Sequence, residues 1–396
     1  MTTAEIKDMA SKYIINTYGE RQIALVRGEG AYVWDADGKK YLDFVVGIST
    51  VNVGHSHPNV VGAIVEQAKK LMHVSNLYYI EPQAELAKRL VELSFADKCF
   101  FCNSGAEANE AAIKLARKYS KENLGEDKFE IITMLKSFHG RTITTVTATG
   151  QEKYHKGFEP LAPGFKYVPF NDLKATEDAI TDNTCAIMVE PIQVEGGINM
   201  PDDGYLPGLR SLCDKRNLLL IFDEVQTAMG RLGMLFGYEA YGVEPDIITM
   251  AKALGGGAPI GCMATKDDIA ESLTPGSHAS TFGGNPLVCS AALASLNTIV
   301  DEKLAENAQR IGAYLTEKFL ALKEKYPVIK EVRGRGLVIG VELNVEGKEL
   351  VSVCLEAGLI LNCIGTSTIR VVPPLTINQQ HADEFLSIFE KGLASL

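Results

Sequence analysis

The segment DIITMAKALGGGAPIG, residues 246–261, decides the fold class of this chain. It begins as a short β-rich apolar run, ends in a glycine cluster, and places Lys252 between the two. Lysine is rarely buried, because removing water from its ammonium group costs several kcal/mol. Lys252 is therefore either an exposed loop residue or a buried amine with a lowered pKa, whose neutral form is a nucleophile.

Runs of the same kind recur from about residue 60 onward. The β-rich runs are KCFFCN at 98–103, EIITMLK at 130–136, CAIMVEP at 185–191 and LLLIFDEV at 218–225. Helical patterns such as AEANEAAIKLARKYSKENL at 106–124 lie between several of them. Strands that alternate with helices predict an α/β fold, with a mostly parallel sheet covered by helices.

At 396 residues the chain is longer than one hydrophobic core usually supports, so two domains are expected. A long helical stretch runs from about residue 286 to residue 325, and shorter strands and a helix follow it. We predict a large domain over residues 56–290 and a small α+β domain over residues 291–396. Residues 1–55 are expected to pack with the small domain.

The formal net charge of -11 argues against nucleic acid or an anionic membrane as a partner, because both attract clustered Lys and Arg. No run approaches the roughly 18 apolar residues of a membrane span, and the N-terminus lacks a signal-peptide pattern. The eight cysteines are scattered, as in proteins with reduced thiols. A cytoplasmic location is therefore expected.

Several familiar motifs can be set aside. Cys99 and Cys102 form a CxxC, but residues three apart on a strand point to opposite faces, so a redox pair is not expected. The Gly-Lys pairs lack the spacing of a phosphate-binding Walker loop, and GGGAPIG lacks that of a dinucleotide-binding loop. His55 and His57 have no further ligands at metal-site spacing, so no metal is expected.

The segment NSGAEANE, residues 103–110, follows a predicted strand and opens a helix, with Asn103 or Ser104 as its N-cap. The amides of Gly105 and Ala106 at this helix N-terminus suit a phosphate group. Capped helices without ligands are common, so this segment needs support from elsewhere in the chain.

That support comes from Asp223, which ends an apolar strand at the edge where open α/β sheets bind ligands. Its carboxylate could bind a metal, act as a general base, or pair with a protonated ring nitrogen, and no neighbouring group favours a metal. Lys252 follows by 29 residues, about one strand-helix-strand unit, so both can share one sheet edge. Lysine, aspartate and a phosphate-binding helix together predict a pyridoxal phosphate (PLP) site.

These segments resemble the class III aminotransferases of PLP fold type I. The resemblance rests on NSGAEANEAAIKLAR, SFHGRT, IFDEVQTAMGR, AKALGGGAPIG and STFGGNP. It implies a large domain with a mostly parallel seven-stranded sheet between helices, a smaller α+β domain, and a homodimer with active sites at the subunit interface. Almost end to end, the chain is similar to members that use N2-acetyl-L-ornithine as amino donor.

The resemblance implies roles for the cofactor-binding residues. Lys252 would hold the cofactor as an internal aldimine and later shuttle a proton, and Asp223 would keep the pyridine nitrogen protonated. Phe138 would stack on the ring, and Gln226 would contact its phenolic oxygen. Three residues would bind the phosphate, the last of them from the partner subunit: Gly105, Ala106 and Thr281. Two more are expected in the cofactor site: Glu224 and Val225.

The resemblance also implies a substrate site. Arg141 would clamp the substrate α-carboxylate by a bidentate pair, and Ser280 would reach the site from the partner subunit. Glu195 would cover Arg370 while the amino donor binds, and release it for the carboxylate of 2-oxoglutarate. The pair could equally be a structural salt bridge.

Two departures from the family pattern bear on substrate range. Val194 stands just before Glu195 where similar enzymes have glycine, and a β-branched residue stiffens the backbone there. Ile48 stands where ornithine aminotransferases carry a tyrosine that helps hold the free α-amino group of ornithine. The isoleucine favours a donor with an acylated α-nitrogen.

The expected activity is transfer of the terminal amino group of N2-acetyl-L-ornithine to 2-oxoglutarate, as in arginine biosynthesis. It would give N-acetyl-L-glutamate 5-semialdehyde and L-glutamate in a ping-pong pattern. Ornithine, N-succinyl-diaminopimelate and 4-aminobutyrate remain alternative donors. Rival classes are a PLP aminomutase or racemase, which would need no keto acid, and a non-enzymatic binding protein, which would have no use for Lys252.

Overall fold

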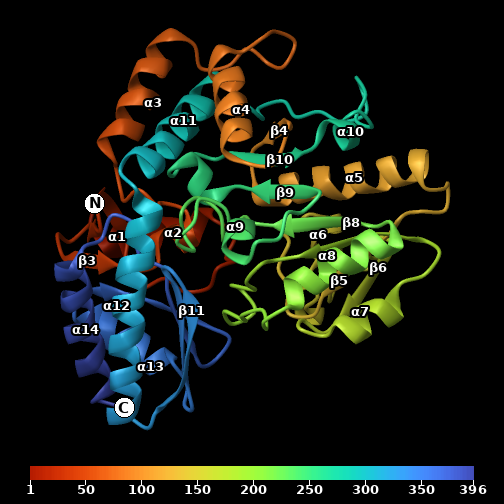
Figure 1. Ribbon diagram of the computed structural model, residues 1–396. Helices are drawn as coiled ribbons and strands as arrows, with labels where there is room; N and C mark the ends of the chain where they lie inside the picture. The colour runs from red at the N-terminus through yellow and green to blue at the C-terminus, as the bar shows by residue number, and fades with distance from the viewer.

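The computed structural model describes residues 1–396 and is built around a seven-stranded sheet (Figure 1). All of its strands run parallel except β10, which is antiparallel to both of its neighbours. The expected mostly parallel sheet is confirmed. In spatial order the strands are β4 (Lys98–Cys102), β10 (Gly261–Thr265), β9 (Ile247–Met250), β8 (Leu219–Asp223), β7 (Thr184–Val189), β5 (Glu130–Met134) and β6 (Phe165–Val168).

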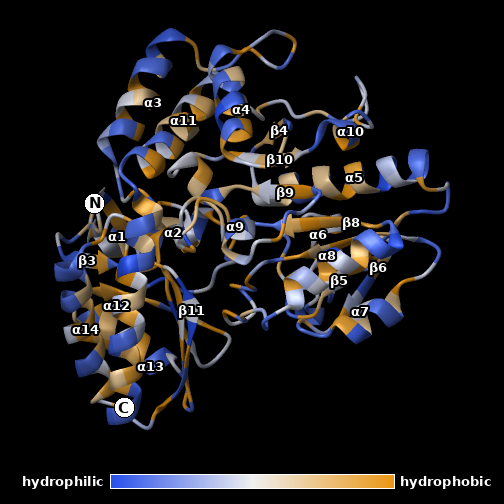
Figure 2. Cartoon of the chain, viewed as in Figure 1, coloured by the Kyte–Doolittle hydropathy of each residue, from blue (hydrophilic) through white to orange (hydrophobic).

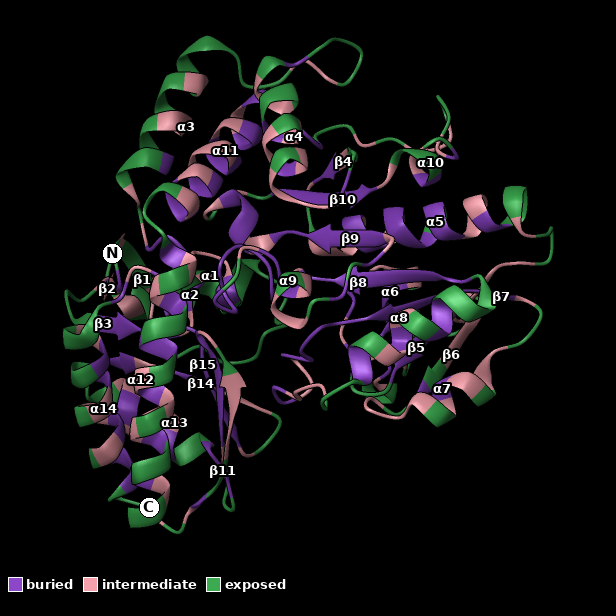
Figure 3. Cartoon of the chain, viewed as in Figure 1, coloured by how far each residue is buried: buried purple, intermediate pink, exposed green.

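Helices cover both faces of this sheet, which explains why its central strands are buried at every position and mostly apolar. The residues of β7 and β8 are all buried, and alternate residues pack toward opposite faces. Ile221 packs in the cluster that includes helix α5 (Gly105–Asn123), whereas Phe222 packs in the cluster that includes helix α8 (Tyr205–Arg216). In Figures 2 and 3 the strands are mainly hydrophobic and buried, while the outward turns of the helices are hydrophilic and exposed.

Shorter helices complete this part of the molecule, and a group of three longer ones lies beside its β4 edge (Figure 1). The short ones are α6 (Ile143–Ala148), α7 (Leu173–Ala179), α9 (Gly237–Tyr241) and α10 (Asp267–Ala270), with 3-10 turns η1 (Glu152–Tyr154) and η2 (Lys252–Gly255). The longer ones are α3 (Pro58–Lys70), α4 (Glu81–Leu93) and α11 (Pro286–Asp301). Helix α11 contacts both α3 and α4.

The C-terminal part contains a second, four-stranded sheet packed against helices. Its strands, in spatial order, are β11 (Ile329–Arg335), β12 (Val338–Leu343), β15 (Thr368–Val371) and β14 (Asn362–Ile364). The helices are α12 (Leu304–Lys325), α13 (Lys348–Glu356) and α14 (Gln379–Leu393). The expected long helical stretch after residue 286 is two helices, α11 and α12, because Lys303 adopts a left-handed conformation (φ 53°) between them.

The N-terminal segment joins the C-terminal part through a third sheet. After helix α1 (Thr3–Tyr13), strands β1 (Leu25–Glu29), β2 (Tyr32–Asp35) and β3 (Lys40–Asp43) form an antiparallel ladder. The last of them pairs in parallel with β13 (Leu359–Ile360). The short α2 segment (Val46–Ser49) then leads toward the central sheet. The exact domain boundaries at residues 55 and 290 remain predictions.

Smaller expectations can also be compared with the structure. Phe101 and Cys99 pack with one core cluster and Phe100 with another, so successive residues of β4 alternate between faces as expected. All eight cysteines are free thiols. No helix combines the length and the apolar character that a membrane crossing requires.

Candidate active site

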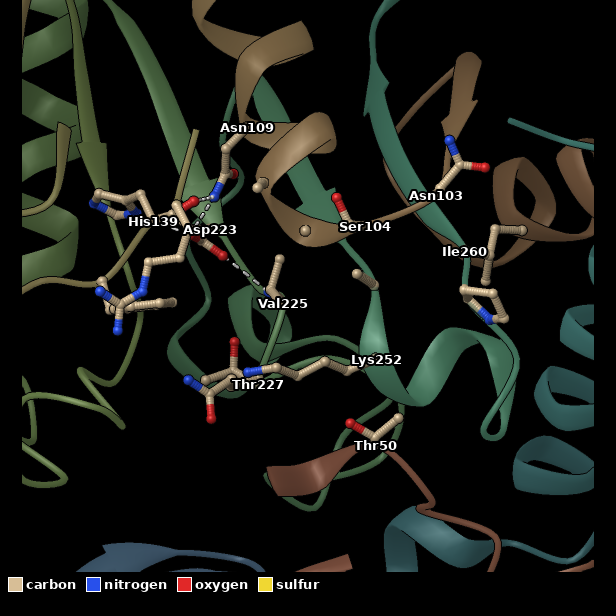
Figure 4. A pocket seen from close by; sticks show the side chains of 18 of the residues that line it. Thr50, Asn103, Ser104, Asn109, His139, Asp223, Val225, Thr227, Lys252 and Ile260 are labelled. Carbon is tan, nitrogen blue, oxygen red and sulfur yellow. Dashed lines mark hydrogen bonds and ion pairs between the residues drawn. The ribbon is translucent and has the colours of Figure 1, made fainter. Parts of the chain in front are cut away.

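A cavity of ≈ 450 Å³ lies at the carboxyl ends of the parallel strands (Figure 4). Its lining includes Asp223, which ends β8, and Lys252, which follows β9. Glu190 follows β7, and Phe138 comes from the loop after β5. This is the edge at which open α/β sheets bind their ligands.

Lys252 is half-buried, and its side chain extends into this cavity (Figure 4). Burial lowers its pKa to about 8, and the charge of Arg370 lowers it as well; Glu195, Asp223 and Glu190 act in the opposite direction. The backbone at Lys252 is left-handed, with φ 45°, which is costly for a residue with a side chain and is characteristic of functional sites. The amine is therefore held where its neutral, nucleophilic form is populated near neutral pH.

Asp223 is buried and held by three hydrogen bonds, drawn in Figure 4. Asn109 Nδ2 donates to its Oδ2 at 2.7 Å, His139 Nδ1 lies 2.8 Å from the same oxygen, and the Val225 amide donates to Oδ1 at 3.1 Å. The amide of Asn109 is itself fixed, because Thr249 Oγ1 donates to its Oδ1 at 2.7 Å. These contacts present a rigid carboxylate to the cavity.

Helix α5 points its N-terminus at the same cavity. Ser104 is the N-cap, and its Oγ accepts from the amide of Glu107 at 3.2 Å. The first amides of a helix have no partner within the helix, so those of Gly105 and Ala106 can bind an anion. A Cβ on Gly105 would lie only 2.8 Å from Cγ1 of Val225, so glycine is required for this close approach.

The residues in the cavity fit PLP. A helix N-terminus suits the phosphate, a buried carboxylate suits a protonated ring nitrogen, and a lysine with a lowered pKa suits the aldehyde. The Gln226 amide also lines the cavity, and its Oε1 is buried without a hydrogen-bond partner. It therefore has hydrogen-bonding capacity left for a ligand.

Glu195 and Arg370, the pair expected from the sequence, are in contact. Arg370 is almost fully buried on β15; its Nη1 donates to Glu195 and its Nε donates to Asn362 Oδ1 at 3.1 Å. Burial alone would raise the pKa of Glu195, but Arg370 and Lys252 bring it below its ordinary value. The pair links the loop after β7 to the C-terminal sheet, and Val194 beside it is completely buried.

Other predicted residues do not line the Lys252 cavity. Thr281 and Ser280 line a different cavity, beside β4. Glu224 is buried and turned toward helix α9, where its carboxylate accepts from the amides of Gly237 and Tyr238, the latter at 2.6 Å. The side chain of Glu224 therefore does not line the Lys252 cavity.

Sequence reasoning missed three residues of this site. Asn109 and His139 hold Asp223, and Glu190 lines the cavity while its carboxylate accepts from the Phe138 amide at 3.1 Å. Burial, and then the charge of Asp223, raise the pKa of Glu190 well above its ordinary value. Glu190 ends the run CAIMVE just as Asp223 ends LLLIFD, so the same signal could have identified it.

The fold is that of a PLP-dependent transaminase, and the cavity fits the cofactor of such an enzyme. The chain belongs to the family described as aminotransferase class-III, whose model matches residues 14–393. It is 54% identical over 388 residues to the acetylornithine aminotransferase of Methanocaldococcus jannaschii, covering 97% of this chain and 96% of that protein. It is 51% identical to that of Caldanaerobacter subterraneus, covering 97% and 98%.

Solved structures agree with this assignment. An ornithine aminotransferase from Toxoplasma gondii, in which partial occupancy of PLP is described at the active site, superposes with a TM-score of 0.96. It shares 34% sequence identity, with 100% of this chain and 95% of that chain covered. An acetylornithine aminotransferase from Elizabethkingia anophelis gives a TM-score of 0.91 at 36% identity, with both chains fully covered.

Proposed function

We propose that this transaminase transfers the terminal amino group of N2-acetyl-L-ornithine to 2-oxoglutarate, giving N-acetyl-L-glutamate 5-semialdehyde and L-glutamate. One observation carries the proposal. One cavity brings together Lys252, Asp223, the α5 N-terminus and Arg141. This cavity lies in a chain that is about half identical to several proteins named acetylornithine aminotransferase. The products would serve arginine biosynthesis.

The positions of the cofactor-site residues support the following roles. When bound, PLP supplies an aldehyde that condenses with amines and a ring that accepts electron density from the substrate carbon. Lys252 would hold the cofactor and, once released, move a proton to or from the carbon that bears the amine. Asp223, fixed by Asn109 and His139, would keep a proton on the ring nitrogen.

Two arginines would select the substrates. Arg141 lines the cavity and would bind the α-carboxylate of the donor through two parallel N–H···O bonds. Arg370 is paired with Glu195. When the Glu195 side chain moves away, Arg370 would bind a carboxylate of 2-oxoglutarate. Because the donor and the keto acid would use the same site in turn, a ping-pong pattern is expected.

Donor choice would depend in part on the α2 segment. Thr50 lines the cavity, and Ile48 lies two residues before it in a left-handed conformation, with φ 62°. An apolar side chain offers no hydrogen bond to a charged α-ammonium group, which supports an acylated donor over ornithine. N-succinyl-diaminopimelate and 4-aminobutyrate are the other donors to compare.

We also propose a cytoplasmic homodimer. Ser280 and Thr281 would line the partner's active site, as the family resemblance implies, and they do not line the Lys252 cavity of their own chain. Several large apolar side chains are exposed on a single chain, one beside Thr281 in the sequence and three in the segment whose Asn76 donates to Ser280 O, as expected of a surface that a partner covers: Phe282, Leu77, Tyr78 and Tyr79. Eight free thiols are consistent with a reducing compartment.

The test is the rate of glutamate formation with each donor at a fixed 2-oxoglutarate concentration. We expect kcat/KM to be highest for N2-acetyl-L-ornithine and to fall at least about 10-fold for L-ornithine. The reason is that Ile48 offers no hydrogen bond to the charged α-ammonium group of ornithine. Product formation without any keto acid would indicate an aminomutase. A higher kcat/KM for ornithine than for its acetylated form would refute the proposed donor.

A further inference from the structure

Arg141 stands out in the cavity as a cation without an ionic partner. It is exposed, none of the salt bridges in the chain includes it, and its guanidinium group lies over two aromatic rings. Its guanidinium carbon lies 4.0 Å from the ring centroid of Tyr154 and 5.2 Å from that of Phe138. A long exposed side chain without such contacts would sample many rotamers, most of them unsuited to a bidentate contact.

The two rings are arranged so that they support one another. Tyr154 and Phe138 meet edge to face, with centroids 5.9 Å apart and an interplanar angle of 83°. This geometry is favourable for aromatic pairs, and a guanidinium lying over a ring face is favourable in turn. We call Phe138, Tyr154 and Arg141 the aromatic cluster.

The backbone that carries Tyr154 is fixed independently of Arg141. The Lys136 amide donates to Gly150 O at 2.8 Å, the Gly150 amide donates to Ser137 Oγ at 3.0 Å, and Gln151 Nε2 donates to Ser137 O at 2.9 Å. A Cβ on Gly150 would lie 2.2 Å from Met134 O, so the two segments are in direct backbone contact. The η1 turn thus sets Tyr154 against the loop that carries Phe138 and Arg141.

We propose that Tyr154 is a positioning residue that sets donor specificity by holding the guanidinium of Arg141 ready for the donor α-carboxylate. Because the ring restricts Arg141 before the donor arrives, less freedom is lost on binding. The ring contributes only to donors that carry this carboxylate. The inference rests on the proposed function, in which Arg141 binds that group.

The proposal predicts a specific pattern for two donors. N-acetylputrescine is N2-acetyl-L-ornithine without its α-carboxylate, and is therefore a matched substrate. Tyr154→Leu should lower kcat/KM for N2-acetyl-L-ornithine by about 2- to 30-fold, mainly by raising KM, and leave N-acetylputrescine unchanged. Tyr154→Phe keeps the ring and should restore nearly the full value. Tyr154→Gln provides a second ring-free variant if the leucine variant folds poorly.

A binding measurement separates positioning from chemistry. N2-acetyl-L-norvaline has the same carboxylate but no terminal amine, so it binds without reacting. Its Kd, measured by calorimetry on the PLP-loaded enzyme, should rise by the same factor in Tyr154→Leu. In an Arg141→Ala background the leucine substitution should change nothing further, because the ring acts only through the arginine.

The outcomes separate a failure of the proposed function from a failure of the role given to Tyr154. If Arg141→Ala leaves kcat/KM for N2-acetyl-L-ornithine unaltered, the carboxylate role in the proposed function is wrong. If Arg141→Ala abolishes the preference for the carboxylated donor but Tyr154→Leu does not reduce it, only the present inference is overturned. Equal losses for both donors in Tyr154→Leu would also overturn it, since they would indicate a general structural role.

Discussion

The attachment of PLP to Lys252 should have an unusual pH dependence. Burial, and then the charge of Arg370, lower the pKa of Lys252 to about 8 from 10.5. At pH 7 about one-tenth of such lysines are neutral, against about one in three thousand at the ordinary pKa. The reactive amine is therefore about 300-fold more abundant than in an exposed lysine.

The assay is stopped-flow mixing of cofactor-free enzyme with excess PLP, with absorbance recorded from about pH 6 to about pH 10. A lowered pKa means that the amine loses its proton earlier as pH rises, so the rate constant should rise to half its maximum near pH 8 and then level off. An N-acetylated lysine amide in free solution serves as the control, and its rate should still be climbing at the upper end of the range.

Two variants test the cause of the shift. Glu195 raises the pKa of Lys252 and Arg370 lowers it, so Glu195→Gln should move the midpoint to lower pH and Arg370→Gln to higher pH. A wild-type rate that keeps climbing through pH 10, or midpoints that move in the same direction in both variants, would refute this electrostatic account.

Three further predictions concern single residues. Gly105→Ala would place a methyl group 2.8 Å from Val225. It should weaken PLP binding at least about 10-fold in a fluorescence titration. An unchanged affinity would argue against a phosphate site at the N-terminus of α5. Asn109→Leu removes a donor to Asp223 and should lower kcat about 5- to 100-fold, the equivalent of about 1–3 kcal/mol, with little change in KM. Glu195→Gln leaves the buried Arg370 without its carboxylate partner and should lower the free energy of unfolding in urea by about 3–5 kcal/mol. A decrease of less than about 1 kcal/mol would mean that solvent reaches the pair.

The fold class and the centre of the site are predictable because their signals are local. Apolar runs that end in polar residues identify strands and the edge where they end, so the order of these runs along the chain is enough to place Asp223 and Lys252 together. The glycine at position 105 is predictable for the same reason, since a strand followed by a capped helix needs close backbone approach there.

Contacts between distant segments are not predictable from one sequence. Asn109 approaches Asp223 across 114 positions, and nothing in the helical pattern around it distinguishes it from a surface residue. Tyr154 lies in a loop without periodicity, and its contact with Arg141 depends on how two segments pair. The orientation of the Glu224 side chain is equally unpredictable from the sequence, because residues that follow a strand can turn to either side.

The central claim, that Lys252 works with PLP as a transaminase for N2-acetyl-L-ornithine, is tested most directly by the visible absorption spectrum of the loaded enzyme. We predict that the absorption band of the lysine-bound cofactor bleaches on addition of N2-acetyl-L-ornithine and returns on addition of 2-oxoglutarate. Lys252→Ala, as the control, should show neither the band nor the cycle. A band that persists after the donor is added, or an unchanged cycle in Lys252→Ala, would contradict the claim.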